Sequence, residues 1–423
     1  MWLGWLACRP DPEVRSPPDA EVPPVETGVP PGSSPTTPTT PTTPSVGLGA
    51  PEVVPLPFVT VGELVPSAVL TVTDLGGADG LPLAVAVDGP FAVDGALDPL
   101  AVGGARAFTV AFTGAVDAPT LAAGAAVVTA GDWRVEVALA AVVGDPELPA
   151  LDWTTDDWGT RAIAPFPSAP FPEGGGGPWD DGSVLVFVPA ALGDHGELGV
   201  VTHLHGFGAV LADTIADERL VELHAMSGRE AVFIAPQGPV AASSGDFGQL
   251  EEAGGHARLV RDVLAVLYRD GLVTRPVIGA QVVSSHSGGY AAAASVIQRG
   301  GSALSALFLY DSVYGESATF EAFAVDGGVV FSNYTATGGT DANNVALRAD
   351  LEDDGVVVVD DFRVDRLLAS DAAIGFTASD HAHVMRDGAT HARWLAASPL
   401  RRSPAAAPEL LAVVSDGARA EVR

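Results

Sequence analysis

The stretch that decides the fold reads Val282-Val283-Ser284-Ser285-His286-Ser287-Gly288-Gly289-Tyr290, and four alanines follow it. Apolar residues lead up to Ser284 and small residues surround Ser287, so the pattern predicts a strand, a sharp turn and a helix. A serine at such a turn projects its Oγ from the carboxyl edge of a sheet. The amide of Gly288 points into the same space at a helix N-terminus, which gives Ser287 the surroundings of a nucleophile.

This turn resembles the nucleophile elbow of the α/β-hydrolases, with Ser287 in the serine position. The usual motif is Gly-x-Ser-x-Gly, and Ser285 stands here in place of the first glycine. The resemblance implies a mainly parallel sheet covered by helices, and an acyl-enzyme mechanism that needs an acid and a histidine besides the serine. The alternative is an ordinary loop rich in serine and glycine, so evidence from the rest of the chain is needed to choose between a nucleophile elbow and a loop.

Composition narrows the class of protein. The chain has 423 residues, 53 acidic against 21 basic side chains, and a net charge of -32. Such a charge argues against nucleic acid and anionic lipid headgroups as partners and favours a surface adapted for solubility. The single cysteine, Cys8, excludes an internal disulfide framework.

The N-terminus has two unusual parts. Residues 1–8 end in Leu-Ala-Cys, which resembles the tail of a bacterial lipoprotein signal, so Cys8 would carry a lipid as the only contact with a membrane. An incidental cysteine in a short apolar terminus is the alternative. Residues 9–50 are rich in proline and threonine and predict a stiff spacer or a disordered terminus. Together they indicate an extracytoplasmic protein, tethered to the cell envelope or secreted.

Residues 51–147 predict an antiparallel β-sandwich, because short alternating runs are separated by turns of Gly, Asp and Pro. Three landmarks resemble the immunoglobulin-like domains of the abnormal-spindle and hydin type: Asp88 to Phe91, Leu100 to Gly104 and Thr109 to Phe112. No Cys, His or paired acids that could do chemistry occur in this segment. The resemblance therefore implies a spacer or adhesion module.

Residues 148–182 predict a linker or a lead-in to the next domain, and three tryptophans there favour packing. Residues 183–398 alternate strand candidates with helix-length segments, as expected for an α/β-hydrolase domain, and residues 399–423 are assigned to a tail. All nine histidines lie between His195 and His391, which places the chemistry in this second domain. In a parallel sheet the active site lies beyond the carboxyl ends of the strands.

After a strand that ends near Thr202, the chain reads His203-Leu204-His205-Gly206-Phe207-Gly208. This run resembles the turn of the α/β-hydrolases that offers a backbone amide to the oxyanion. The resemblance implies an oxyanion hole formed by the amides of Phe207 and Gly288. The pairs His203/His205 and His381/His383 also suit a metal such as zinc, but the further ligands of known metallohydrolases are missing, so we expect no metal or cofactor.

The candidate acid is Asp311, which follows a predicted strand that ends at Tyr310. Its rival is Asp341, because the acid of this superfamily more often follows the next strand. The sequence around Asp341 is polar, and this side chain fits the start of a helix.

The candidate base is His381, the histidine nearest the end of the last predicted strand, with His383 in reserve. The order serine, acid, histidine is that of the α/β-hydrolases. We therefore expect a serine hydrolase that cleaves a small or polymeric carboxylic ester. Two other interpretations stay open: a binding protein whose hydrolase fold has lost activity, and a metal-dependent hydrolase that uses the His-x-His pairs.

Overall fold

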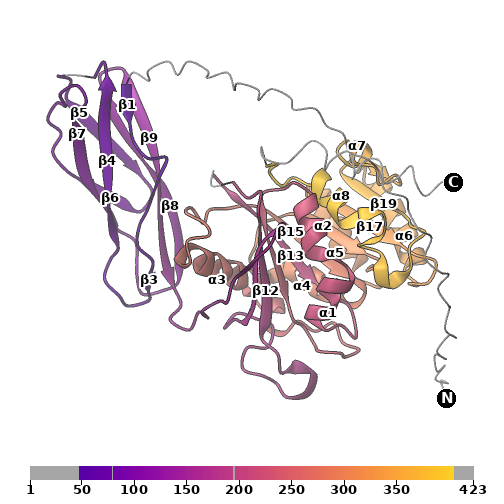
Figure 1. Ribbon diagram of the computed structural model, residues 1–423. Coiled ribbons are helices and arrows are strands. Elements are labelled where there is room, and N and C mark those ends of the chain that lie inside the picture. The colour runs from indigo at the N-terminus through magenta and orange to yellow at the C-terminus, as the bar shows by residue number, and fades with distance from the viewer. Residues whose placement is uncertain (1–46, 79, 194–195, 404–423) are drawn as a thin grey trace, which may run out of the picture. The chain divides into compact units, whose positions relative to one another are not determined.

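The computed structural model describes residues 47–78, 80–193 and 196–403, and its chain is drawn in Figure 1. The predictions for Cys8, for the signal remnant at residues 1–8 and for nearly all of the spacer lie outside the described residues, as does most of the predicted tail. No helix in the described part of the chain is both long and apolar enough to span a membrane.

The N-terminal part consists of two sheets. One has four strands in the order β1 (Gly47–Gly49), β4 (Ser67–Gly76), β7 (Ala105–Phe112) and β6 (Phe91–Asp94), all antiparallel. The other has the order β2 (Val53–Pro55), β9 (Trp133–Gly144), β8 (Thr120–Ala130) and β5 (Leu83–Asp88), with β3 (Val59–Thr60) also on β9.

Alternating burial joins the two sheets into one core. On β7 the side chains of Phe108, Val110 and Phe112 point inward, and they belong to the same apolar cluster as Leu70 and Val72 of β4. The period of two along these strands is the pattern that predicted a sandwich.

The antiparallel prediction is wrong for β2 and β3, which both run parallel to β9. Pro51, Pro55 and Pro57 interrupt this part of the chain, and a proline cannot donate to a ladder. The segment therefore pairs in short pieces along the edge of β9 and does not form a long hairpin strand.

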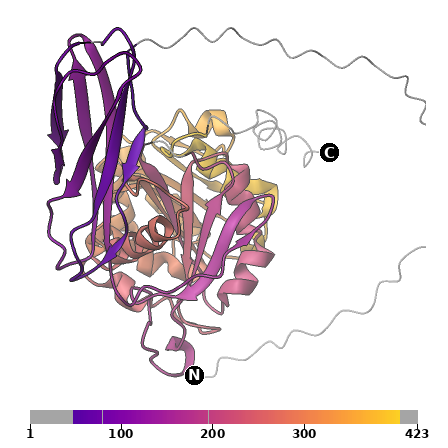
Figure 2. The ribbon, with the colours of Figure 1, turned by 60° about the vertical axis from the view of Figure 1, so that its left-hand side comes forward.

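The second part contains a ten-stranded mixed sheet, seen from two directions in Figures 1 and 2. Its order is β10 (Thr154–Thr155), β11 (Gly159–Pro165), β12 (Ser183–Pro189), β14 (Ala231–Pro236), β13 (Leu198–Leu204), β15 (Ile278–His286), β16 (Leu304–Tyr310), β17 (Val329–Tyr334), β19 (Ala372–Phe376) and β18 (Val358–Val359). The pairings from β14 to β18 are parallel, and those from β10 to β14 are antiparallel.

The boundaries of this part differ from the predicted 183 and 398. The lead-in at residues 148–182 supplies β10 and β11, so the sheet begins before residue 183. At the other end, Leu400 is buried and Arg402 forms a β-bridge with Arg229, so the packed chain continues past residue 398.

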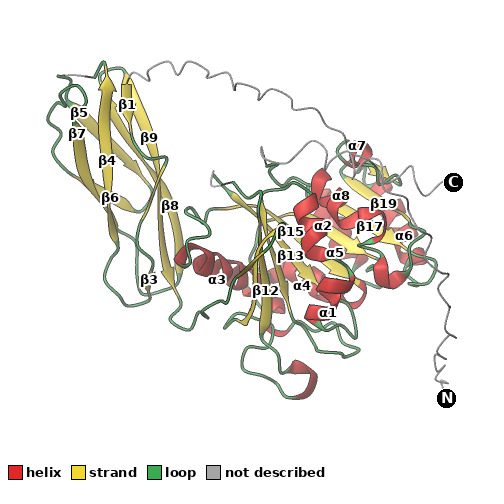
Figure 3. Ribbon diagram, viewed as in Figure 1, coloured by secondary structure: helices red, strands yellow, loops and turns green. Residues whose placement is uncertain are grey.

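Helices cover both faces of the sheet, as the red ribbons of Figure 3 show. Side chains of α3 (Gly255–Arg269), α4 (Tyr290–Arg299), α5 (Ser317–Val325) and α6 (Asp341–Asp353) share one apolar cluster with alternate strand residues. Side chains of α1 (Leu211–Asp217), α2 (Leu220–Met226), α7 (Val364–Leu367) and α8 (Thr390–Ala397) share the cluster of the opposite face. Because both faces are covered, the central strands are apolar on both sides.

The order in which successive strands are added to the sheet changes direction at β13. β14 lies on one side of β13, and β15, the next strand along the chain, lies on the other. The carboxyl ends of β13 and β15 therefore lie at a topological switch point, where sites of open α/β sheets are found. His205 and Gly206 follow β13, and Ser287 follows β15.

Candidate active site

Ser287 lies at a sharp turn between β15 and α4, where a single turn of 3-10 helix spans Ser287–Gly289. Its φ is 50°, a left-handed conformation that costs free energy in a residue with a side chain. Glycines make room for it, because a Cβ on Gly206 would lie 2.8 Å from the Cβ of Ser287. Strain of this kind is what the nucleophile elbow imposes on its serine.

Ser285, which stands in the position of the usual glycine, is fully buried. Its hydroxyl lies 2.9 Å from that of Ser312, and the Ser312 hydroxyl donates to the carbonyl of Ser287 at 2.8 Å. The extra hydroxyl is therefore satisfied, and its chain of hydrogen bonds links the turn to the residue after Asp311.

His381 joins Ser287 to Asp311. Its Nε2 lies 2.9 Å from the Oγ of Ser287, and its Nδ1 lies 2.8 Å from Oδ2 of Asp311. If Nδ1 carries the proton and donates to the carboxylate, Nε2 is free to accept the hydroxyl proton of Ser287. The three side chains come from the ends of β15, β16 and β19, so the parallel sheet brings them to one edge.

The Asp311 carboxylate is buried and fully engaged. Thr335 donates to Oδ2 at 2.5 Å, and Thr340 donates to Oδ1. Burial raises the pKa of Asp311, but hydrogen bonds from His381, Thr335 and Thr340 outweigh it and hold the pKa below its ordinary value. Asp311 is thus kept ionised beside the imidazole, in a backbone conformation with φ of 45°.

His286, the residue before the turn, holds the loop that carries His381. Its Nε2–H donates to the carbonyl of His381 at 2.8 Å, and the two imidazole rings lie 4.8 Å apart. Burial lowers the pKa of His286 to about 4, with the nearby His381 acting in the same direction. The side chain therefore remains neutral near pH 7 and adds no charge next to His381.

The two alternative residues lie elsewhere. Asp341 is the first residue of α6, where a carboxylate is favourable to the helix dipole. His383 pairs through Nδ1 with Asp380 at 2.9 Å, and both side chains are partly exposed. In the described part of the chain, the hydroxyl of Ser287 has its histidine partner in His381 and that imidazole has its acid partner in Asp311. The geometry therefore favours Asp311 and His381 over their alternatives.

The turn after β13 lies against the turn at Ser287. A Cβ on Gly288 would lie 2.1 Å from the ring of Phe207, so the residues that carry the two predicted oxyanion amides are in contact. His205 fixes this turn: its Nδ1 lies 2.9 Å from the carbonyl of Gly206, and its Nε2 accepts the amide of Gly238 at 2.8 Å.

His203 and His205 are both buried and both engaged by the protein, His203 through the hydroxyl of Ser284 at 2.9 Å. Burial lowers the pKa of each imidazole. No group of three or more potential metal ligands occurs in the described ranges, which end at residue 403 and omit His195.

Four residues near the site were not among the predicted site residues. Thr335 and Thr340 act on Asp311, and His286 acts on the loop of His381. Tyr314 is the fourth: its hydroxyl donates to the carbonyl of Gly338 at 2.7 Å, and burial raises its pKa. Only the spacing of Tyr314 from Asp311 along the chain could have pointed to it.

Comparisons with known proteins give weak likenesses only. No protein-family model matches the sequence, and no curated protein matches it. A feruloyl esterase module from Clostridium thermocellum shares 11% identity over 60% of this chain and 89% of its own, with a TM-score of 0.35. Esterase PE8 shares 18% identity over 48% of this chain and 93% of its own, with a TM-score of 0.30. A PapD-like domain of human CEP192 shares 12% over 28% of this chain and all of its own, with a TM-score of 0.20.

Proposed function

We propose that this protein is a serine hydrolase that cleaves carboxylic esters through an acyl-enzyme. The observation that carries the proposal is the unbroken chain of hydrogen bonds from Ser287 through His381 to the buried Asp311. A hydroxyl, an imidazole and a carboxylate in this order supply a nucleophile, a general base and a group that stabilises the imidazolium.

In the first half-reaction the Oγ of Ser287 attacks the ester carbonyl carbon while its proton passes to Nε2 of His381. Asp311 stabilises the resulting imidazolium, and the oxyanion accepts hydrogen bonds from the amides of Phe207 and Gly288. Each such donor contributes about 3 kcal/mol in the transition state. The imidazolium then protonates the leaving alcohol as the carbon–oxygen bond breaks. Water, activated by the same histidine, hydrolyses the acyl-enzyme.

The test is labelling of the full chain with a fluorophosphonate probe. We expect wild type to be labelled at Ser287 and Ser287→Ala to remain unlabelled, with hydrolysis of a p-nitrophenyl ester reduced by at least about 10³-fold. Ser285→Ala is the matched control, because that hydroxyl is buried and turned toward Ser312. Equal labelling or equal turnover of wild type and Ser287→Ala would remove the nucleophile from the proposal.

We also propose that the enzyme acts outside the cytoplasm. A lipid on Cys8 would anchor it to the membrane, and the spacer would connect this anchor to the β-sandwich. The support is the sequence alone: Leu6-Ala7-Cys8 followed by the segment rich in proline and threonine. Metabolic labelling with a fatty-acid analogue tests it, since Cys8→Ser would abolish incorporation. Incorporation unchanged by that substitution would contradict it.

A further inference from the structure

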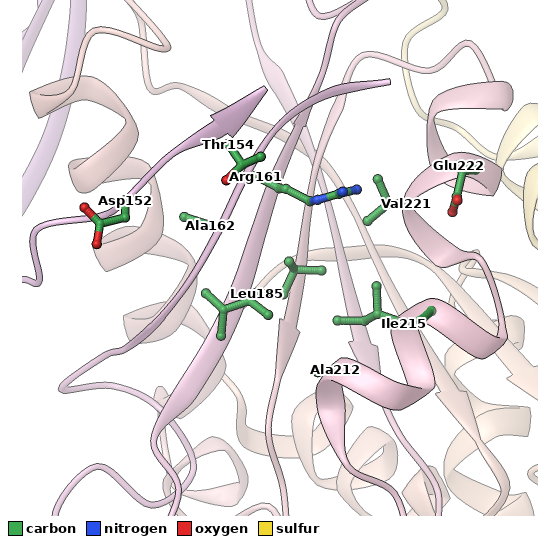
Figure 4. A pocket seen from close by; sticks show the side chains of 11 residues that line it. Asp152, Thr154, Arg161, Ala162, Leu185, Ala212, Ile215, Val221 and Glu222 are labelled. Carbon is green, nitrogen blue, oxygen red and sulfur yellow. The ribbon is translucent and has the colours of Figure 1, made fainter. Parts of the chain in front are cut away.

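A cavity of about 540 Å³ lies away from Ser287, between strands β10, β11 and β12 and helices α1 and α2 (Figure 4). Its walls are mainly apolar and include Ala162, Leu185, Ile215 and Val221. Leu185 and Val221 belong to the buried core, so the cavity has a firm apolar base. Its volume is in the range that holds a small organic ligand.

The rim of the cavity carries two acidic side chains and one arginine. Asp152 and Glu222 lie on opposite sides, with Arg161 extending between them (Figure 4). The guanidinium of Arg161 is paired with Asp156 at 3.0 Å, whereas Asp152 and Glu222 have no ion-pair partner among the contacts of the described chain. The charge left for a ligand is therefore negative, which favours a cation.

The helix that forms one wall, α1, is hydrogen-bonded at each end to a residue near the candidate active site, Gln237 at its start and Arg386 at its end. At the start of α1 the amide of Leu211 donates to Oε1 of Gln237 at 2.7 Å, and Nε2 of Gln237 lies 3.0 Å from Nε2 of His205. At its end Glu218 accepts the amide of Arg386 at 3.2 Å, five residues after His381. A ligand that presses on Ala212 or Ile215 of α1 therefore acts on a helix connected to both turns.

We propose that this cavity binds an amphipathic cation, an apolar body with an ammonium head, and that its occupancy changes turnover at Ser287. The apolar part lies against Leu185, Ile215 and Val221, and the ammonium lies at the rim next to the Glu222 carboxylate. The binding step stands on the cavity alone, whereas the effect on turnover rests on the proposed esterase function.

Isothermal titration of the full chain with n-octylammonium, below its aggregation concentration, tests the binding step. We expect saturable binding at one site, and binding of octanoate at least tenfold weaker because its charge has the wrong sign. Glu222→Gln should weaken octylammonium binding about 3- to 10-fold. Equal affinity for octanoate and octylammonium, or no binding of octylammonium, would overturn the proposal.

A second test of binding uses larger side chains that fill the cavity. Ala212 and Ala216 lie on exposed positions of α1, so Ala212→Leu and Ala216→Leu should fold and reduce the space for the ligand. Ala349→Leu, on an exposed position of α6, is the matched control. We expect both α1 variants to lose at least tenfold in affinity and the control to keep wild-type affinity. Wild-type affinity in both α1 variants would place the ligand elsewhere.

Titration of Ser287→Ala separates this site from the proposed function. Binding of octylammonium should be unchanged in that variant, since the cavity does not include Ser287. In wild type we expect octylammonium to change kcat for a p-nitrophenyl ester at least twofold, with no such change in Ala212→Leu. Binding without any change in kcat would overturn the coupling, and a wild type inactive on esters would overturn the proposed function while the calorimetric result stands.

Discussion

The β-sandwich and the mixed sheet of this chain bury different kinds of side chain. In the described residues of the sandwich Asp74 is the one buried polar or charged side chain, and its Oδ1 accepts the amide of Gly76 at 2.8 Å to shape a turn. Near the carboxyl edge of the mixed sheet, many polar side chains are buried: His203, His205, Ser284, Ser285, Asp311, Ser312, Asn333, Thr335 and Thr340.

Under the proposed function, the buried polar side chains at the sheet edge serve the reaction, whereas the core of the sandwich is almost wholly apolar. A buried polar group costs free energy unless its hydrogen bonds are complete, so an apolar core is the simpler way to stabilise a fold. The network around Asp311 stabilises one charge state and one orientation of His381. Variants near Asp311 should therefore lower kcat, whereas variants in the core of the sandwich should lower the free energy of unfolding.

The largest effect should follow from Asp311→Asn. One of the two threonines can still donate to the amide oxygen, but the charge that stabilises the His381 imidazolium is lost. We expect kcat for ester hydrolysis to fall about 10⁴-fold while KM changes little. Asp341→Asn is the control and should leave kcat within about twofold, at a cost of no more than ~1 kcal/mol in stability. The reverse ranking of the two variants would identify Asp341 as the acid.

The opposite behaviour is expected in the sandwich. Phe108→Ala removes a buried ring from the core of the two sheets and should destabilise the protein by about 3–5 kcal/mol. Denaturant unfolding followed by tryptophan fluorescence measures the loss, and Val69→Ala, at a position that is 64% exposed, is the control. The kcat/KM of the folded variant should stay within about twofold of wild type. A large loss of kcat/KM at full folding would contradict the division between the two parts.

The sequence predicts the strands of the second part well, because apolar runs such as residues 329–334 are bounded by glycine and aspartate. Observed β17 coincides with that range, and observed α4 coincides with the predicted helix that begins at Tyr290. Strand β11 gives no such signal, because Gly159–Pro165 contains one large apolar side chain, Ile163, begins with glycine and ends with proline. Its place in the sheet is set by pairing with β12.

The candidate site likewise contains residues that the sequence predicts and residues that it does not. Ser287, Asp311 and His381 follow strand ends, so a topology argument can place them at one edge of the sheet, and the structure has them in contact. Thr335 and Thr340 come from a loop whose path depends on tertiary packing. Their hydrogen bonds to Asp311 could not be read from spacing, and the same holds for the contact between His286 and the His381 loop.

A smaller effect on catalysis is expected at His286, which acts on the orientation of His381. His286→Leu keeps the volume of the side chain but removes the donor to the His381 carbonyl. We expect kcat to fall about 10- to 100-fold with KM nearly unchanged, because about 1.4 kcal/mol corresponds to a factor of ten. His286→Gln retains an N–H donor and should restore part of kcat. Equal loss in the Leu and Gln variants would assign His286 a packing role only.

The smallest effect should be a change in how stability depends on pH, at Glu218. Burial raises the pKa of Glu218 to about 7, although the hydrogen bond from the Arg386 amide lowers it. The folded protein therefore binds more protons at this group than the unfolded chain does between about pH 4.5 and 7, and stability falls as pH rises through that window.

Glu218→Gln cannot ionise and still offers an oxygen to Arg386. We expect wild type and variant to differ little at pH 4.5 and the variant to be more stable by about 1 kcal/mol at pH 8. Glu222→Gln, on the rim of the cavity, is the control for loss of one negative charge. Denaturant unfolding at the two pH values measures the difference, and an equal response of Glu218→Gln and Glu222→Gln would show that the gain comes from net charge and not from the buried position of Glu218.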